Sequence, residues 1–286
     1  MTLISLKQAV EHAKANQYAL GSFNVSNLNL FHAIMAAAKA KRSPVIISLA
    51  EVHLNYAAIQ EVAPIVRNVA HQTDIPVVLH LDHGLTYPVV VEAIRSGFSS
   101  VMFDGSALPY EENIKQTAEV VKMAHAVGVS VEAELGAIGG DEGGGLYGEA
   151  NEAFFTDPKM AKDFVERTGI DCLAVSIGNV HGMYKGEPKL DFPRLQEIEK
   201  ITGMPLVLHG GSGISDDDFR KAITMGIRKI NFYTGMSQVA LKVLKESLDN
   251  PEPGYDHYAQ ALASVEKPVQ KTVEHQMDVF GSANKC

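Results

Sequence analysis

Short apolar runs rich in valine, isoleucine and leucine recur along the chain, and the stretches between them carry apolar residues at helical spacing. Eight runs have this character, at residues 18–25, 43–51, 75–83, 99–106, 129–136, 171–179, 204–211 and 228–235. Most are continuous rather than alternating, which is typical of parallel strands covered on both faces. Eight strand–helix units in succession predict an α/β fold of the (β/α)8 TIM-barrel type. No linker interrupts the series, so we expect one domain over residues 1–286.

Three segments depart from the simple alternation of strand and helix. A glycine-rich stretch at 139–151 follows the fifth predicted strand, and a long connection at 178–193 follows the sixth. After the eighth strand a C-terminal helical tail is predicted to run to Cys286, with a break near residues 250–256. The N-terminal stretch carries charged residues inside its apolar pattern, so we interpret it as a first helix rather than a signal peptide.

Composition narrows the class of protein. The chain has 286 residues, of which 46% are hydrophobic, and its 25 basic and 34 acidic residues leave a net charge of −9. An acidic chain without a basic cluster argues against a nucleic-acid or membrane-surface partner, although a few local donors could still hold one anionic substrate. Two cysteines, Cys172 and Cys286, cannot form a disulfide framework, so we expect a reducing, cytoplasmic setting.

Polar and ionisable residues stand where the predicted strands end. In a barrel, the carboxyl ends of all strands open into one shared mouth, where catalysis occurs. Buried polar groups are costly without partners, so several of them at one rim indicate a site. The residues that the strand ends bring to this rim are Asp82, His83, Asp104, Glu134, His181, His209, Asn231 and Thr234.

Three of these residues are histidines that follow three different strands: His83, His181 and His209. Their wide spacing excludes a zinc-finger pattern and fits a catalytic site, where three protein ligands leave one position open for substrate or water. A lone histidine is more often a hydrogen-bonded core residue, but three at equivalent strand ends favour a metal site. His80 shares a strand face with Asp82, so we expect it to support the site from behind.

Glycine-rich turns follow the seventh and eighth predicted strands. The segment HGGSGISDDD (209–218) opens a helix with Ser215 as the expected N-cap, and KINFYTG (229–235) follows the eighth strand. Barrel enzymes often bind phosphate with these two loops through free backbone N–H groups. The alternative is a plain tight turn, and the position of the loops in the barrel favours a phosphate site.

No lysine is placed for Schiff-base chemistry, which needs an amine that projects from a strand into the mouth. The sixth predicted strand has none, and Lys229 stands at the start of the eighth strand, which we interpret as the wrong end. Lys185 lies on a loop four residues after His181 and is better placed to hold a phosphate. Stabilisation of a carbanion would therefore come from the metal.

Six motifs in order, HLDHG, VMFDGS, VEAELG, HG-x-YKGEP, LVLHGGSGI and KIN, resemble those of the class II, metal-dependent fructose-bisphosphate aldolase family. That family includes the tagatose-bisphosphate aldolases, and the resemblance covers nearly the whole chain. It implies Zn2+ as the cofactor, with a monovalent cation such as Na+ near the phosphate. It also implies a small sugar phosphate as substrate and a homodimer or homotetramer as the assembly.

The resemblance also assigns roles to single residues. Asp82 matches the acid/base that takes the proton from the C4 hydroxyl, and Glu142 matches a mobile-loop acid that takes part in proton transfer. The matching metal ligands are His83, His181 and His209, with Asp104 and Glu134 at an alternative metal position. The matching pocket for dihydroxyacetone phosphate comprises Gly182, Lys185, Gly210, Gly211, Ser212, Asn231 and Thr234. Further substrate contacts are expected from Asn24, Ala50, Phe232 and Tyr233.

The implied reaction is the reversible aldol cleavage of a ketose 1,6-bisphosphate, of the fructose or tagatose type, to dihydroxyacetone phosphate and glyceraldehyde 3-phosphate. The aldehyde half of the pocket departs from the family. Ala50 stands where a serine commonly holds the aldehyde fragment, Tyr233 replaces a small or polar residue, and Ser237 falls where others place Arg, Lys or Gln. The remaining sources of a cation for a C6 phosphate are a neighbouring subunit or Arg42, Arg67 and Arg95.

Three alternatives therefore stay open. The departures favour an aldolase for a ketose 1-phosphate with an unphosphorylated or modified aldehyde end. A non-catalytic barrel that serves as a binding or subunit protein would be expected to lack a ligand or the base, and none is lacking. A metal-dependent phosphosugar isomerase or epimerase would share the barrel but not this set of motifs.

Overall fold

The core of the molecule is a closed barrel of parallel strands, seen in a computed structural model that describes residues 2–140, 147–249 and 257–286. Within these residues the order around the barrel is β1-β10-β9-β7-β5-β4-β3-β2. The strands are β1 (Leu20–Asn24), β2 (Val45–Ala50), β3 (Val77–Gly84), β4 (Ser100–Phe103), β5 (Ser130–Leu135), β7 (Cys172–Val175), β9 (Leu206–Leu208) and β10 (Ile227–Asn231). Each of the eight predicted runs overlaps one of them, with β3 and β10 each extending one residue beyond its run, so the predicted (β/α)8 TIM barrel is confirmed.

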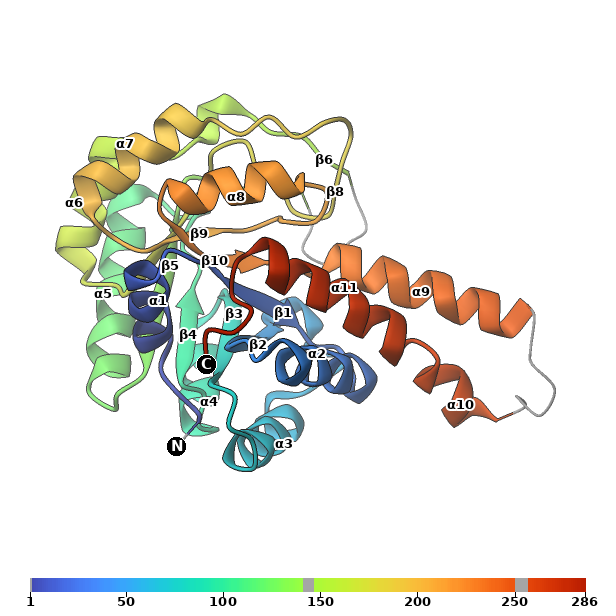
Figure 1. The fold of residues 1–286 in the computed structure, drawn as a ribbon. Coiled ribbons are helices and arrows are strands. Elements are labelled where there is room, and N and C mark those ends of the chain that lie inside the picture. The colour runs from blue at the N-terminus through green and yellow to red at the C-terminus, as the bar shows by residue number, and fades with distance from the viewer. Residues whose placement is uncertain (1, 141–146, 250–256) are drawn as a thin grey trace.

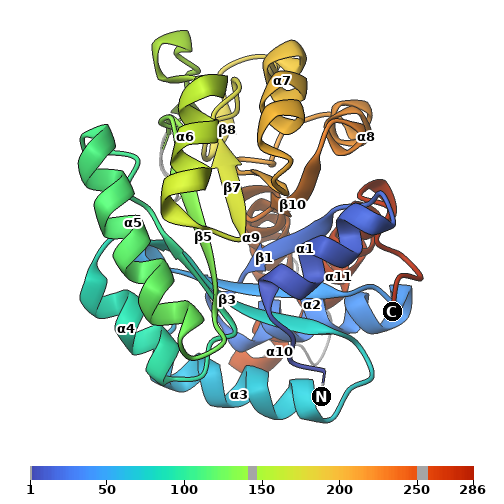
Figure 2. The ribbon, with the colours of Figure 1, turned by 90° about the vertical axis from the view of Figure 1, so that its left-hand side faces the viewer.

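Helices surround the barrel on its outer face (Figures 1 and 2). The α-helices of the described residues are α1 (Leu6–Ala15), α2 (Leu28–Lys41), α3 (Ile59–His71), α4 (Tyr87–Arg95), α5 (Tyr110–His125), α6 (Pro158–Thr168), α7 (Phe192–Thr202), α8 (Asp216–Thr224), α9 (Thr234–Asp249), α10 (Tyr258–Ala263) and α11 (Glu266–Val279). Two short 3-10 helices are also present: η1 (Glu51–His53) follows β2, and η2 (Glu152–Phe154) precedes α6. None of the helices in the described part of the chain has the length and apolar character to cross a membrane.

The helix starts follow from local sequence. Ser5 caps α1 in a capping box with Gln8, which satisfies two backbone donors that the first turn leaves free. Ser215 caps α8 by accepting from the backbone N–H of Asp218, so this predicted N-cap is confirmed. The strands are buried along their whole length, as expected for continuous apolar runs between an inner and an outer layer.

The two ends of the barrel differ. The apolar face of α1, with Leu6, Ala9 and Val10, packs on inward-facing residues of the strands such as Ile46 and Val78 and closes the amino end. The carboxyl end carries the loops and stays open. The insertions predicted after the fifth and sixth barrel strands meet there in a two-stranded sheet of β6 (Tyr147–Gly148) and β8 (Met183–Tyr184).

The C-terminal tail is helical, as predicted. In Figure 1, α9 and α10 extend away from the barrel, while α11 returns along α2. The predicted break at 250–256 lies outside the described residues.

Candidate active site

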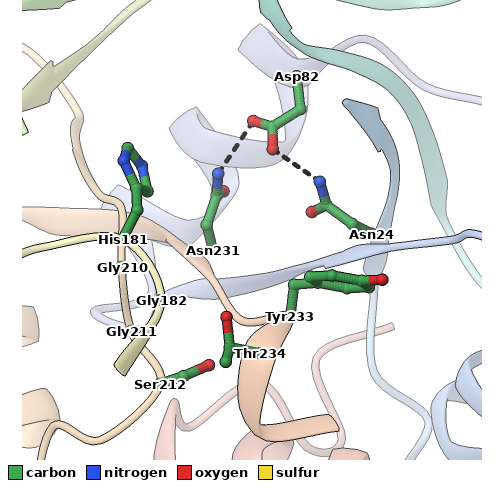
Figure 3. Close-up of a pocket in the computed structure, with 10 residues that line it drawn as sticks. All are labelled: Asn24, Asp82, His181, Gly182, Gly210, Gly211, Ser212, Asn231, Tyr233 and Thr234. Carbon is green, nitrogen blue, oxygen red and sulfur yellow. Dashed lines mark hydrogen bonds between the residues drawn. The ribbon is translucent and has the colours of Figure 1, made fainter. Parts of the chain in front are cut away.

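A pocket opens at the carboxyl ends of the strands, as Figure 3 shows. It lies between the ends of β1, β3 and β10 and the loops that follow β7 and β9. Its lining residues are Asn24, Asp82, His181, Gly182, Gly210, Gly211, Ser212, Asn231, Tyr233 and Thr234. All ten are among the site residues predicted from sequence, some from their position at strand ends and the others from the resemblance to the aldolase family.

The three predicted histidines converge beside this pocket. The ring centroid of His83 lies 5.0 Å from that of His181 and 4.5 Å from that of His209, and the His181 and His209 centroids are 5.8 Å apart. One nitrogen of each ring lies within 4.8 Å of a nitrogen of each of the others. All three side chains are buried. The three rings therefore form a group that could hold one metal ion.

The protonation of two of these rings supports a metal. His83 Nδ1 lies 2.7 Å from Asp104 Oδ2, and His209 Nε2 lies 2.8 Å from Glu132 Oε1. An ionised carboxylate only accepts hydrogen bonds, so these two nitrogens carry the protons. The remaining nitrogens, His83 Nε2 and His209 Nδ1, face each other at 2.7 Å. Two lone pairs at this distance repel unless a proton or a metal ion lies between them, so the two nitrogens are placed to accept a divalent metal.

The backbone of His83 adopts an uncommon conformation. Its φ is +42°, in the left-handed region that residues other than glycine rarely adopt. The pairing of β3 with β4 shifts register between Leu81 and Gly84, at the same place. Irregularities of this kind re-aim side chains next to active sites. Here the result is that Asp82 and His83, adjacent in sequence, both face the mouth.

Asp104 and Glu134 lie on the other side of His83. One ligand atom from each of His83, Asp104 and Glu134 lies within 4.8 Å of the other two, which makes a second possible metal group. Burial opposes the ionisation of Asp104, but its hydrogen bond with His83 outweighs burial and keeps the pKa of Asp104 well below the ordinary value. Asp104 is therefore ionised and can either orient His83 or bind a metal directly.

Asp82 is held by two side-chain amides. Its carboxylate accepts from Asn24 Nδ2 and from Asn231 Nδ2, both at 2.9 Å, as the dashed lines in Figure 3 mark. Burial alone would raise the pKa of Asp82, but the electrostatic influence of neighbouring His83 and of the Lys229 amine holds it well below the usual range. The arrangement presents an oriented, ionised carboxylate to the pocket.

The barrel interior below the mouth contains a buried group of ionisable residues, of which Glu132 was not predicted from sequence. Lys229 was interpreted as lying at the wrong end of its strand, but its amine reaches Glu132, at 2.9 Å, and approaches Asp82 at 3.8 Å. His80 donates to or accepts from Ser100 Oγ at 2.8 Å, and burial, aided by Lys229, lowers its pKa to about 3. The signal for Glu132 was its spacing of two from Glu134, which puts both on one face of β5.

The glycine turns form the opposite wall of the pocket. Gly210 has φ +64°, and a Cβ there would overlap the backbone carbonyl of Val180, so only glycine fits. The Tyr184 hydroxyl donates to the Gly210 carbonyl at 3.0 Å and accepts from the Val180 N–H at 3.2 Å, which ties the two loops together. Ser212 Oγ accepts from the Gly235 N–H at the start of α9. A helix N-terminus next to glycine-rich backbone is a site that favours an anion.

Three of the predicted substrate-binding residues do not line this pocket. Lys185 pairs with Glu149 at 2.8 Å, and both side chains are more than half exposed. Phe232 is buried in the core, and Ala50 is buried in β2 opposite Asp82. Glu142 lies outside the described residues.

Tyr233 forms one wall of the mouth. Its ring packs against His53 of η1, with centroids 4.6 Å apart, and His53 was not predicted from sequence. Ala50 ends β2 immediately before this 3-10 helix. Two of the three departures noted in the sequence, Ala50 and Tyr233, thus adjoin η1, whereas Ser237 lines a separate cavity.

The three arginines considered for a C6 phosphate lie at the opposite end of the barrel. Arg42 is the C-cap of α2 and pairs with Asp74, which precedes β3. The Arg67 guanidinium packs against Gly97, in the turn before β4, and Arg95 is the last residue of α4. Barrel helices start near the mouth and end at the amino ends of the strands. None of these three side chains is therefore placed near the pocket.

Comparison with known proteins agrees with this geometry. A family model described as "Fructose-bisphosphate aldolase class-II" matches residues 4–285. The chain is 42% identical, over 289 aligned residues that cover 100% of both proteins, to a protein of Bacillus subtilis (strain 168) named "Probable fructose-bisphosphate aldolase". The crystal structure of the YdjI aldolase from Escherichia coli K12 matches with a TM-score of 0.87, 35% identity and 99% of each chain covered. A putative fructose-1,6-biphosphate aldolase from Coccidioides immitis matches with a TM-score of 0.86 and 32% identity, covering 100% of this chain and 99% of the other. The chain belongs to the class II fructose-bisphosphate aldolase family and is a class II aldolase, a carbon–carbon lyase.

Proposed function

We propose that this aldolase uses Zn2+ to cleave a ketose 1,6-bisphosphate, of the fructose or tagatose type, reversibly to dihydroxyacetone phosphate and glyceraldehyde 3-phosphate. The observation that carries the proposal is the three-histidine group beside an ionised Asp82 that faces the same pocket. A metal and a base side by side are what aldol cleavage without a Schiff base requires.

The proposed zinc ligands are His83, His181 and His209, with Asp104 and Glu134 offering an alternative position. A zinc ion held there would act as a Lewis acid that polarises the ketose carbonyl and stabilises the charge left on the C3 fragment. His83 and His209 are suited to the role because their outer nitrogens are already hydrogen-bonded to Asp104 and Glu132.

Asp82 is the proposed base. Its carboxylate would take the proton from the C4 hydroxyl as the C3–C4 bond breaks, and the electron pair of that bond would stay on C3. The amides of Asn24 and Asn231 would hold the carboxylate toward the substrate. Glu142, which lies outside the described residues, is proposed to take part in proton transfer, as the resemblance to the family implies.

The phosphate of the dihydroxyacetone phosphate half is proposed to bind at the glycine turns. The backbone of Gly182, Gly210 and Gly211, together with Ser212 and Thr234 at the start of α9, would supply the donors. Lys185 would have to exchange its exposed partner, Glu149, for the phosphate. Such an exposed pair is worth about 0–1 kcal/mol, so the exchange is inexpensive.

A second candidate is a ketose 1-phosphate whose aldehyde end carries no phosphate or is otherwise modified. The observation that favours it is the placement of the arginines. Arg42, Arg67 and Arg95 lie at the closed end of the barrel. The other four arginines of the sequence are bound to acidic side chains or backbone carbonyls on or beside the outer helices. They are Arg167, Arg194, Arg220 and Arg228. A C6 phosphate would therefore need a cation from elsewhere.

The test is a screen of fructose and tagatose 1,6-bisphosphates and ketose 1-phosphates for release of dihydroxyacetone phosphate by the zinc-loaded enzyme. Zinc-dependent release supports the proposal, and the preferred sugar decides between the two substrate candidates. Conversion of the ketose without cleavage would indicate an isomerase or epimerase. No reaction with any of these sugars would refute both substrate candidates.

We also propose that residues 1–286 act as one domain, which the family match over 4–285 supports. A homodimer or homotetramer is proposed from the resemblance to the family. A cytoplasmic location is proposed because Cys172 and Cys286 are both free thiols.

A further inference from the structure

A buried ion pair lies inside the barrel, directly below the histidine group. Glu132 extends from β5 and Lys229 from β10, and both side chains are 0% exposed. The Lys229 amine lies 3.0 Å from Glu132 Oε1 and 2.9 Å from Oε2. Neither residue lines the substrate pocket, so neither has a direct part in the chemistry proposed above.

Glu132 contacts one of the three histidines. Its Oε1 lies 2.8 Å from His209 Nε2, on the side of the ring away from His83. Because the carboxylate can only accept, this contact requires the proton of His209 on Nε2 and leaves the lone pair on Nδ1. Nδ1 is the nitrogen that faces His83 Nε2, at 2.7 Å. Glu132 therefore selects the tautomer of His209 in which the free nitrogen points into the metal group.

Lys229 stabilises the ionised form of the buried Glu132 side chain. A lone buried carboxylate is expensive and would tend to become protonated. The Lys229 amine lies within 3.0 Å of both carboxylate oxygens, so it supplies the opposite charge that keeps Glu132 ionised. Glu132 also belongs to a buried group with His80 and Asp82 that resembles a metal site. The Lys229 amine already supplies the cation there, since it lies within 3.8 Å of Asp82 as well.

We propose that Glu132 and Lys229 are a positioning pair for the metal ligand His209: Glu132 fixes the ring and its tautomer, and Lys229 fixes Glu132. The proposal rests on the proposed zinc-dependent function. It differs from a merely structural role, in which the pair fills the barrel interior and any effect on the metal follows from lost stability.

The experiment separates stability from zinc affinity. The variants are Glu132→Gln and the double variant Glu132→Leu/Lys229→Met, and the readouts are the thermal unfolding midpoint and the Zn2+ affinity, measured by competition with a chromophoric chelator. Replacing both members of a buried ion pair by apolar residues of similar size is often neutral for folding, so the double variant should fold. Loss of the partner of a metal-ligating histidine typically weakens metal binding by about 10- to 100-fold.

We expect the double variant to unfold near the wild-type temperature but to bind Zn2+ with an affinity toward the 100-fold end of that range. Glu132→Gln keeps an oxygen that can accept from His209, so its loss should be nearer 10-fold. The matched control is Ser130→Ala on the same strand face: Ser130 is buried and hydrogen-bonded, but to the backbone of Lys7 at the closed end. The control should leave zinc affinity unchanged.

Wild-type zinc affinity in a folded double variant would overturn the proposal, and so would unchanged affinity in Glu132→Gln. A loss of affinity in Ser130→Ala equal to that of Glu132→Gln would also overturn it, because the effect would then follow general destabilisation. If the wild-type protein itself bound no zinc, the proposed function would fail, and that result is distinct from each of these.

Discussion

Replacing Asp82 by alanine removes the proposed acid/base while leaving the three candidate zinc ligands in place. Loss of a positioned acid/base group lowers the rate by about 10²- to 10⁴-fold. At about 1.4 kcal/mol for each factor of ten, that corresponds to about 3–5.5 kcal/mol of the activation barrier. We therefore expect Asp82→Ala to bind zinc and to lose at least two orders of magnitude in turnover.

The same change also affects folding, and the structure bounds the effect. Asp82 is 1% exposed and accepts one hydrogen bond each from Asn24 and Asn231. Its removal leaves two amide donors without this acceptor, at about 1–3 kcal/mol each where they stay buried. The rate must therefore be measured well below the unfolding midpoint of the variant, with an unfolding curve recorded beside it.

The assay is single-turnover release of dihydroxyacetone phosphate, with zinc content determined on the same sample. Asn24→Ala serves as a graded control, because it removes one of the two amides and keeps the base. A lost hydrogen bond to a charged group is worth about 1.5–3 kcal/mol, so Asn24→Ala should lose about 10- to 100-fold. An unchanged rate in zinc-loaded Asp82→Ala would refute the assignment and would mean that Asp82 only orients His83.

Three further changes test other parts of the site. His209→Ala should lose both zinc and turnover, whereas the control His275→Ala, on the surface of α11, should keep both. Zinc bound at wild-type affinity by His209→Ala would contradict the ligand set. Tyr184→Phe removes the hydroxyl that joins two loops of the pocket, so KM for the sugar phosphate should rise about 2- to 10-fold with zinc content unchanged. An unaltered KM would show that this hydroxyl does not help to shape the pocket. Fructose 1,6-bisphosphate should be cleaved with a kcat/KM about tenfold or more below that of another ketose phosphate, because one phosphate contact is missing. If fructose 1,6-bisphosphate is instead the best substrate by tenfold, the departures at Ala50 and Tyr233 are neutral.

The barrel and the rim of the site could be predicted because both depend on local pattern. Continuous apolar runs mark strands buried on both faces, and parallel strands bring their carboxyl ends together. Asp82, His83 and His209 stand at such ends, so their convergence followed from the order of strands. The direction of the helices would also have excluded Arg42 and Arg95 as phosphate ligands, since both stand at helix C-termini.

What could not be predicted depends on contacts across the barrel. Glu132 occupies the middle of a buried strand, and its pairing with Lys229 and His209 across the barrel explains a carboxylate there. Lys229 begins near the closed end, but its four-carbon side chain runs through the interior to reach Asp82. The pairing of Lys185 with Glu149 depends on how two insertions pack together, which no periodicity encodes.

The central claim is that His83, His181 and His209 hold the zinc on which cleavage depends. The most direct measurement strips the protein with a chelator and titrates it with Zn2+ while the release of dihydroxyacetone phosphate is followed. The account predicts no activity in the metal-free protein and a rise that saturates at about one zinc per chain. Full activity in the metal-free protein would contradict it.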